Sequence, residues 1–505
     1  MNGPRTLVVG AGVGGLVAAA LRAARGHRVT VLEKAAAAGG KLRQVTVDGQ
    51  RLDAGPTVFT MRWVFDELFG ALGERLDDRL SLRPARILAR HAWSATETLD
   101  LAADLEAAVE AIGAFSGSDQ ARRYRAFCAC ARNLHAALER PYLRAARPSL
   151  PALLWRCGWR GLPALQRASP LRSLWSALRE FFPDPRLHQL FARYATYCGS
   201  SPFLAPATLM LIAHVEREGV WFVDGGMARV AEALASLAQR QGARLRCRAE
   251  VAEITVSGGR ANGVVLADGE RLAADAVVFN GDVGALAGGL LGAAAQRGWR
   301  RPRTTPSLSA LTWHLVARTG GLPLHHHTVF FGGDYRAEFD ALAAGRLPAD
   351  PTVYLCAQDR RDDDDDGGPE RLMVLVNAPA RVLGPEEIAA CRQASFDRLR
   401  RCGLTLDPRP PTVTTTPADF ARLFPGTQGA LYGPPTHGWR ASFARSGSAS
   451  PLPGLFLAGG SVHPGPGLPM AALSGQLAAA SVLAEGRTST SRWRPTAMPG
   501  GTSMR

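Results

Sequence analysis

Three glycines near the N-terminus, Gly10, Gly12 and Gly15, have the spacing G-x-G-x-x-G of a phosphate-binding turn. In such a turn the first glycine permits a tight bend, the second lets the backbone approach a pyrophosphate, and the third lets a helix pack closely on a strand. Glu33 follows at the distance at which an acidic side chain binds ribose hydroxyls. These residues predict dinucleotide binding, with a simple packing turn as the alternative.

A second glycine-rich loop, residues 459–475, lies close to the C-terminus and follows the apolar run 455–458. It leads into a predicted helix at 469–484, whose N-terminus can face an anion. Pro469 suits the first helical turn because its missing N–H is not needed there. We expect the two loops to serve opposite ends of one cofactor, with the C-terminal strand beside the first strand.

Two further glycine turns indicate which dinucleotide binds. Residues 39–41 (GGK) place a cation beside a close-approach turn, and residues 53–57 (DAGPT) form another turn. A nicotinamide dehydrogenase would continue with regular α/β repeats, whereas repeated glycine turns are typical of the extended site of FAD.

The elements that must position these residues form a β-α-β unit. A buried strand is predicted at 6–9, a helix at 16–25 that Gly26 ends, and a second strand at 28–32. Residues 219–279 are predicted as a strand, a helix and several strands joined by hairpin turns. We expect this later segment to return the chain to the nucleotide-binding sheet.

The predicted fold class is α/β, with a Rossmann-like FAD-binding domain interleaved with a substrate domain and a helical, membrane-facing lobe. The helical lobe contains two stretches that can be interpreted in two ways. Residues 155–175 predict either an amphipathic membrane-facing surface or a core helix pair with solvated arginines. Residues 191–206 predict either the lining of an apolar cavity or ordinary packing. The expected boundaries are 1–98, 219–300 and 423–485 for the FAD-binding parts, 99–218 for the helical lobe, 301–422 for the substrate domain and 486–505 for a disordered tail.

The net charge of +15 by itself suits a polyanion or an anionic membrane surface. Of the 59 basic residues only Lys34 and Lys41 are lysines, and the arginines are scattered singly. We therefore predict no nucleic-acid partner and leave contact with anionic lipid open. Because no apolar run is long enough to span a membrane, we expect a cytoplasmic protein, with attachment to a membrane face left open.

Candidate metal ligands are few. The eight cysteines include no C-x-x-C pair and are expected as small buried residues. The run at 325–327 (HHH) has no acidic or cysteine partner with metal-site spacing, and the acidic run 362–366 is expected to be a solvated loop. No metal site is predicted.

Motifs along the whole chain resemble the flavoprotein desaturases of carotenoid synthesis, relatives of the amine-oxidase type of FAD enzyme. They are VVGAGVGGL, LEKAAAAGGKLRQ, DAGPTVFTMRWVFDELF, RYATYCGSSPFLAPATLM, GGMARVAEAL, FPGTQGALYG and LFLAGGSVHPGPGLPMAALSGQLAAA, spanning residue 7 to about residue 483. The third and fourth motifs are most similar to the acyclic 1-hydroxycarotenoid 3,4-desaturases of phototrophic bacteria, the hydroxyneurosporene or methoxyneurosporene desaturases.

The resemblance implies FAD-dependent desaturation at C3–C4 of 1-hydroxylated acyclic carotenoids such as 1-hydroxyneurosporene and 1-hydroxylycopene, in spheroidene- or spirilloxanthin-type synthesis for photosynthesis. One hydrogen would pass to flavin N5 as hydride and the other would leave as a proton. The lipid-soluble substrate implies a peripheral enzyme of the inner photosynthetic membrane, with O2 or a quinone as electron acceptor. The alternatives are a phytoene desaturase, carotene isomerase or amine oxidase of the same fold, and a non-catalytic flavin- or lipid-binding protein.

By the same resemblance, the N-terminal glycine turn binds the pyrophosphate, Glu33 the adenosine ribose, and Val251 the adenine through its backbone. Residues 55–58 would lie beside the isoalloxazine, and residues 467–470 would place a helix N-terminus under its pyrimidine ring. The expected cofactor contacts are Gly10, Gly12, Val13, Gly14, Gly15, Glu33, Lys34, Gly40, Lys41, Leu42, Gly55, Pro56, Thr57, Val58, Val251, Asn280, Gly459, Gly460, Gly467, Leu468, Pro469 and Met470.

Two positions depart from the family pattern. Lys41 stands where the family often has arginine. Lysine keeps the positive charge but lacks the bidentate fork of arginine. Gly460 and Ser461 stand where many relatives carry an acid for the ribityl hydroxyls. No catalytic residue and no partner for the 1-hydroxyl is identified. His463, His437 and His214 are candidate proton acceptors, each with a structural role as the alternative.

Overall fold

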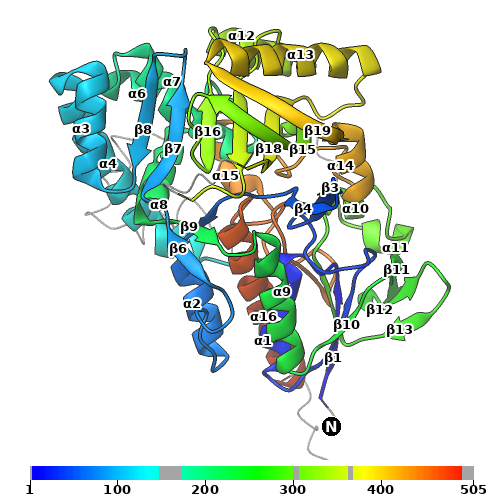
Figure 1. Cartoon of the computed structure of the whole chain (residues 1–505). Coiled ribbons are helices and arrows are strands. Elements are labelled where there is room, and N and C mark those ends of the chain that lie inside the picture. The colour runs from blue at the N-terminus through cyan, green and yellow to red at the C-terminus, as the bar shows by residue number, and fades with distance from the viewer. Residues whose placement is uncertain (1–2, 147–171, 300–305, 362–367, 492–505) are drawn as a thin grey trace, which may run out of the picture.

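The computed structural model describes residues 3–146, 172–299, 306–361 and 368–491. Within these residues, five parallel strands form a first sheet, at the lower end of the molecule in Figure 1. Apart from the edge strand at 244–246, its strands are mostly apolar, as expected where helices and other layers cover a parallel sheet. Their order is β10 (Arg244–Arg246), β2 (Arg28–Leu32), β1 (Arg5–Val9), β14 (Ala276–Phe279) and β20 (Leu455–Leu457).

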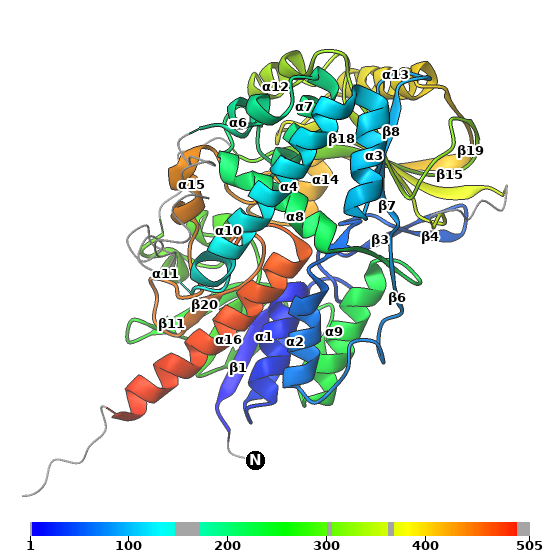
Figure 2. The same cartoon turned by 90° about the vertical axis from the view of Figure 1, so that its left-hand side faces the viewer.

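Three helices, α1 (Val13–Ala23), α9 (Ala228–Arg240) and α16 (Leu468–Ser491), share a buried core with the first sheet. They lie side by side in Figures 1 and 2. At the contact of α1 with α16, a Cβ on Gly475 would lie 2.3 Å from the carbonyl oxygen of Gly14. Because neither residue has a side chain, the two backbones meet, and α16 starts beside the turn that follows β1.

The C-terminal strand lies elsewhere than predicted. Val8 of β1 pairs with Val278 of β14, and Val278 pairs with Phe456 of β20. The expectation that β20 lies beside β1 is therefore wrong, because β14 occupies that place. Within residues 251–279, only β14 returns to the first sheet, since β11 (Val251–Ser257), β12 (Arg260–Leu266) and β13 (Arg271–Ala273) form a separate antiparallel sheet.

The described part of the chain also forms a seven-stranded second sheet. The sheet begins before residue 98, because β7 (Ile87–Ala92) pairs with β16 (His327–Phe330). It therefore includes part of the segment expected to bind FAD. Its order is β19 (Leu404–Thr415), β15 (Ser309–Gly321), β18 (Glu370–Ala378), β17 (Val353–Ala357), β16 (His327–Phe330), β7 (Ile87–Ala92) and β8 (Thr98–Ala102).

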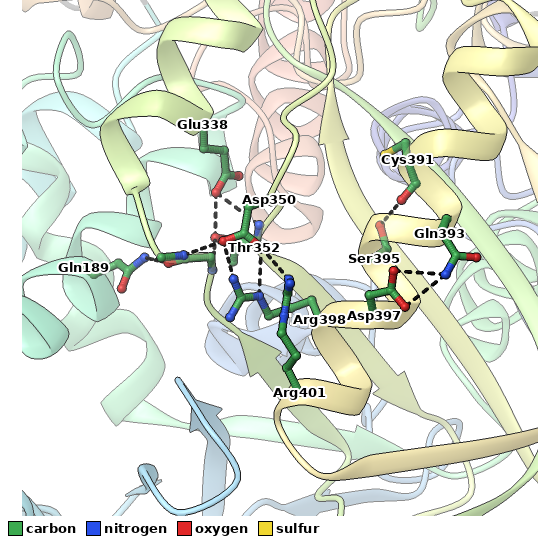
Figure 3. A network of polar contacts seen from close by, with 12 residues as sticks. Gln189, Glu338, Asp350, Thr352, Cys391, Gln393, Ser395, Asp397, Arg398 and Arg401 are labelled. Carbon is green, nitrogen blue, oxygen red and sulfur yellow. Dashed lines mark hydrogen bonds and ion pairs between the residues drawn. The ribbon is translucent and has the colours of Figure 1, made fainter.

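Two helices, α12 (Tyr335–Ala343) and α13 (Pro385–Arg401), lie over the second sheet at the top of Figure 1. Figure 3 shows their polar attachment. Arg398 Nε of α13 donates to Asp350 Oδ1 (3.1 Å), and Arg401 Nη2 donates to the same oxygen (2.9 Å). Glu338 Oε2 of α12 accepts from the amide (3.1 Å) and the hydroxyl (2.6 Å) of Thr352, which directly precedes β17.

Helices also form the predicted lobe beside the second sheet, and they share one apolar core. Within that core Phe191 is fully buried, so part of the stretch 191–206 serves ordinary packing. Residues 147–171, which include most of the stretch 155–175, lie outside the described residues, as does the acidic run 362–366. The helices are α3 (Leu105–Ser116), α4 (Ser118–Leu138), α6 (Leu174–Phe181), α7 (Pro185–Ala192) and α8 (Leu211–Glu218).

Shorter elements connect these layers. They are α2 (Arg62–Ala71), the hairpin β3 (Gln44–Val47) and β4 (Gln50–Asp53), the small sheet β5 (Phe59–Thr60), β9 (Val220–Val223) and β6 (Leu82–Pro84), and the turns η2 (Arg193–Cys198) and η3 (Ala207–Met210). At the C-terminus α16 continues beyond Gly486 to Ser491, so the first residues of the predicted disordered tail are helical instead. Residues 492–505 lie outside the described residues. Among the helices that the structure describes, none is long and apolar enough to cross a membrane.

Candidate active site

A cavity of about 1990 Å³ has walls from both sheets and from the helical lobe. The first sheet contributes Val9 and Phe279, the lobe contributes Leu211 and Ile212, and the second sheet contributes Leu375. This volume is about twice the upper end of ordinary ligand pockets, roughly 1,000 Å³. The cavity therefore has room for a dinucleotide together with a long second ligand.

Nearly all predicted cofactor contacts line this cavity. Gly15 does not, because it packs inward: a Cβ there would lie 2.3 Å from the carbonyl oxygen of Gly10. This packing serves the close approach of α1 to the sheet, and contact of Gly15 with the pyrophosphate stays a prediction. The predicted residues on the cavity wall are Gly10, Gly12, Val13, Gly14, Glu33, Lys34, Gly40, Lys41, Leu42, Gly55, Pro56, Thr57, Val58, Val251, Asn280, Gly459, Gly460, Gly467, Leu468, Pro469 and Met470.

Glu33 is held at the cavity wall by backbone amides. Its Oε2 accepts from Ala11 N and its Oε1 accepts from Ala35 N, both at 2.8 Å. A carboxylate offers about four lone-pair sites. Two of them fix the side chain beside the glycine turn, and the others suit the ribose hydroxyls that the sequence predicts.

Asn280 supplies a polar atom that fits a bound dinucleotide. It follows β14, and its Nδ2 donates to the carbonyl oxygen of Gly10 (3.3 Å). Its Oδ1 is buried and has no hydrogen-bond partner within the described residues. A buried carbonyl oxygen without a donor is unfavourable, so this atom beside the glycine turn is suited to accept from a ligand.

Three charged residues gather where the second glycine loop meets the cavity. The ammonium of Lys41 donates to the carbonyl oxygen of Leu431 (2.5 Å). Burial lowers the pKa of Lys41 and raises that of Asp282, which lies near it. The Arg445 guanidinium donates to carbonyl oxygens of the C-terminal loops, including that of Gly460 (3.4 Å). These groups line the cavity together and bring two basic side chains and one carboxyl group to its cofactor end.

Asp282 and Arg445 are functional candidates that the sequence alone did not single out. Asp282 carries a weak signal, because it comes two residues after Asn280 at the carboxyl end of a predicted strand. Arg445 carries none, since it is one scattered arginine in an arginine-rich chain.

The second glycine loop brings a helix N-terminus to the cavity. Helix α16 begins at Leu468, and residues 467–470 line the cavity. The amide of Gly459 donates to Ser474 Oγ (2.8 Å), which ties the loop to the second turn of α16. Ser461 Oγ accepts from Val283 N (3.2 Å), so this hydroxyl is engaged with backbone. The free amides of the first turn of α16 can stabilise negative charge on a ligand.

The three candidate proton acceptors have structural partners. None of the three is among the described residues that line the cavity. His463 Nε2 lies 2.9 Å from the carbonyl oxygen of Tyr142, and burial lowers the pKa of His463 to about 4. His437 Nε2 accepts from Ser201 N (3.2 Å), and His214 Nε2 lies 3.2 Å from Glu218. The geometry favours the structural interpretation for each.

Two groups of histidines have potential metal ligands close by. His326, His327 and Cys356 have ligand atoms within 4.8 Å of one another, because β16 pairs His327 with Cys356. Cys356 has no metal-site spacing to the histidine run in the sequence, and strand pairing rather than sequence spacing brings it there. His214 forms the second group with His135 and Glu218. The absence of a metal site remains a prediction.

Comparison with known proteins identifies the family. The pattern of the family described as "Flavin containing amine oxidoreductase" matches residues 13–483. A hydroxyneurosporene desaturase of Rubrivivax gelatinosus is 54% identical, over 99% of this chain and 97% of that protein. Another hydroxyneurosporene desaturase, of Cereibacter sphaeroides, is 50% identical over 95% of this chain and 98% of that protein. A zeta-carotene-forming phytoene desaturase of Myxococcus xanthus is 32% identical over 94% of this chain and 93% of that protein. This chain belongs to the flavin-containing amine oxidoreductases and, within them, to the carotenoid desaturases.

Solved structures have the same fold. An oxidoreductase from Methanosarcina mazei has a TM-score of 0.61 at 15% identity, over 95% of this chain and all of that one. Putrescine oxidase bound to putrescine has a TM-score of 0.58 at 16% identity, over 95% of this chain and 99% of that one. The predicted α/β fold of the amine-oxidase type is thereby confirmed, whereas the membrane-facing role of the helical lobe stays a prediction. The family confirms FAD as the cofactor.

Proposed function

We propose that this chain is an FAD-dependent 3,4-desaturase of 1-hydroxylated acyclic carotenoids, acting on 1-hydroxyneurosporene and 1-hydroxylycopene. The observation that carries the proposal is the identity of 54% and 50% to two hydroxyneurosporene desaturases, over nearly the whole chain. The phytoene desaturase relative is only 32% identical, which favours a hydroxylated substrate over phytoene.

The residues at the cofactor end have distinct tasks in this proposal. The turn at Gly12 would bring backbone amides to the pyrophosphate, and Glu33 would hold the adenosine ribose. The first turn of α16 would stabilise negative charge on the pyrimidine ring. FAD, when bound, supplies the acceptor for the hydride that leaves the substrate.

The rest of the cavity suits a polyene. Leu209, Leu211, Ile212 and Val215 line it from the lobe, and Leu375 lines it from the second sheet. Their side chains would bind the long hydrocarbon by burial of apolar surface and exclude water from the reacting carbons. An apolar wall of this kind supports a lipid substrate rather than a small amine.

We further propose that the enzyme attaches peripherally to the inner photosynthetic membrane, because its substrate dissolves in lipid. The electron acceptor is O2 or a quinone. Flotation with vesicles that contain anionic lipid tests the attachment, and anaerobic turnover with added quinone separates the acceptors. Recovery of all protein in the vesicle-free fraction would contradict attachment.

A pigment assay tests the activity. The FAD-loaded protein is incubated with membranes that contain 1-hydroxyneurosporene, neurosporene, phytoene or lycopene, and products are identified by absorption spectrum and mass. We expect the hydroxylated carotenoid to lose two hydrogens and gain one conjugated double bond. Conversion of phytoene alone would show that the substrate assignment is wrong.

A further inference from the structure

We propose that the hydroxyl groups of Thr57 and Tyr354, backed by His327, form the subsite that binds the 1-hydroxyl of the carotenoid. This inference rests on the proposed function. Thr57 Oγ1 lies 2.7 Å from Tyr354 Oη, which lies 2.7 Å from His327 Nδ1. Thr57 and Tyr354 line the cavity, and His327 is buried behind them.

The chemistry of the substrate restricts where such a subsite can lie. C1 carries the hydroxyl, and a single carbon separates C1 from C3. The hydroxyl must therefore be bound within reach of the place where C3 and C4 lose hydrogen. Residues 55–58 are expected beside the isoalloxazine, and Thr57 is the residue of this segment that has a side-chain hydroxyl. The position of Thr57 meets this requirement.

The fold brings the three residues together from distant parts of the chain. Thr57 lies between β4 and β5, whereas Tyr354 belongs to β17 and His327 to β16 of the second sheet. The two strands pair antiparallel, with Tyr354 opposite Val329, which is two residues after His327. The two side chains can therefore meet on one face of the sheet.

The hydrogen bonds leave one site for a ligand. Burial lowers the pKa of His327 and raises that of Tyr354, so both side chains are neutral. If His327 Nδ1 accepts from Tyr354, then Thr57 donates to Tyr354, and the lone pairs of the Thr57 oxygen stay free to accept from a ligand. If His327 Nδ1 instead donates to Tyr354, then Tyr354 donates to Thr57, and the hydroxyl proton of Thr57 stays free to donate to a ligand. A hydroxyl ligand, both donor and acceptor, fits either case, and an unhydroxylated carotene leaves Thr57 without that bond.

A second polar group on the cavity wall is already engaged. Tyr197 Oη accepts from Arg193 Nη1 (2.8 Å) and donates to Glu216 Oε1 (2.5 Å). The other oxygen of Glu216 accepts from Tyr194 Oη (2.8 Å). Because the Tyr197 hydroxyl both donates and accepts within this group, we assign the substrate hydroxyl to Thr57 and Tyr354 instead.

The test measures preference for the hydroxyl. The kcat/KM for 1-hydroxyneurosporene is divided by that for neurosporene in the FAD-loaded wild type and in Thr57→Val, Thr57→Ser, Tyr354→Phe and Tyr197→Phe. Dissociation constants for both carotenoids are measured by quenching of tryptophan fluorescence. We expect Thr57→Val and Tyr354→Phe to lower the ratio roughly 10- to 100-fold, with a matching loss of binding preference. Thr57→Ser keeps the hydroxyl and should keep the preference.

The outcomes separate the inference from the proposed function. If the wild type converts none of the carotenoids, the proposed function fails. If the wild type converts 1-hydroxyneurosporene while Thr57→Val and Tyr354→Phe keep its preference, the subsite assignment is overturned. A loss of preference in Tyr197→Phe, with Tyr354→Phe unaffected, would place the subsite at Arg193 and Glu216. Equal conversion of both carotenoids by the wild type would also overturn the inference.

Discussion

At the scale of single residues, the glycines of the first turn differ in what surrounds their missing side chains. A Cβ at Gly15 or Gly14 would press on backbone atoms, at 2.3 and 2.8 Å. A Cβ at Gly12 would lie nearest to the side-chain amide nitrogen of Asn280 (2.8 Å), and this side chain can move. Gly12 also has φ −74°, which any residue adopts. Gly12 is therefore the position where bulk can block the cofactor without preventing the packing of α1.

The substitution Gly12→Trp should abolish FAD binding, because the indole would extend into the cavity where the pyrophosphate is expected. We expect less than about a tenth of the wild-type flavin absorbance per protein, with secondary structure retained by circular dichroism. Gly70→Ala is the matched control, since no atom lies within 4 Å of its added Cβ. Normal flavin content in Gly12→Trp would contradict the assignment of the turn.

Local residues were predictable from the sequence and distant contacts were not. The glycine turn and Glu33 lie within one β-α-β unit, so their spacing alone indicates their geometry. Thr57 was expected at the flavin, yet its bond to Tyr354 depends on a strand residue that follows it by 297 positions in the chain. The proximity of His327 to Cys356 likewise depends on the register of β16 and β17, which no motif encodes.

At the scale of elements, the contact between α1 and α16 places both glycine loops at one cavity. The predicted helices and strands of the first sheet agree with the structure in type, although α16 extends further than its predicted end at residue 484. The order of the strands did not follow from the same patterns, because β14 and β20 are both short apolar runs and either could lie beside β1. Pairing along the sheet, rather than the sequence of each strand, decides this order.

The helix contact can be tested with Gly475→Ala. The added Cβ would lie 2.3 Å from the carbonyl oxygen of Gly14 and 2.9 Å from Cβ of Val17, so one backbone must move. We expect the free energy of unfolding to fall by about 1–3 kcal/mol, as for other overpacked cores. FAD affinity should fall as well, since the first turn of α16 lines the cavity.

Urea unfolding and titration of the apoprotein with FAD measure these two effects. Ala480→Gln on the exposed side of the same helix is the control and should change neither quantity appreciably. Wild-type stability together with wild-type FAD affinity in Gly475→Ala would contradict the proposed tightness of this contact.

At the scale of the whole molecule, the second sheet and its covering helices support one wall of the cavity from outside. Glu338 of α12 is 2% exposed, and its partner Thr352 lines the cavity. Burial raises the pKa of Glu338 from 4.5 to about 7. An ionised Glu338 is therefore unfavourable in the folded protein relative to the unfolded chain, which couples global stability to pH.

The sign of the coupling follows from the raised pKa. Below the ordinary value of 4.5 Glu338 is protonated in both states, and its contribution to stability is fully present. As pH rises through about 7 the folded state must ionise a buried group, and that stability is lost. The substitution Glu338→Gln keeps an oxygen that can accept from Thr352 and removes the ionisation. It should therefore stabilise the protein more at pH 8 than at pH 5, by about 2 kcal/mol.

Urea midpoints of wild type and Glu338→Gln at pH 5 and pH 8 measure this difference. Other titrating groups affect both proteins alike, so they cancel when the variant is compared with wild type at each pH. Glu110→Gln makes the same change at an exposed position and should show no such pH dependence. An equal effect of Glu338→Gln at both pH values would show that Glu338 ionises at its ordinary pKa. The attachment of α12 would then not depend on pH.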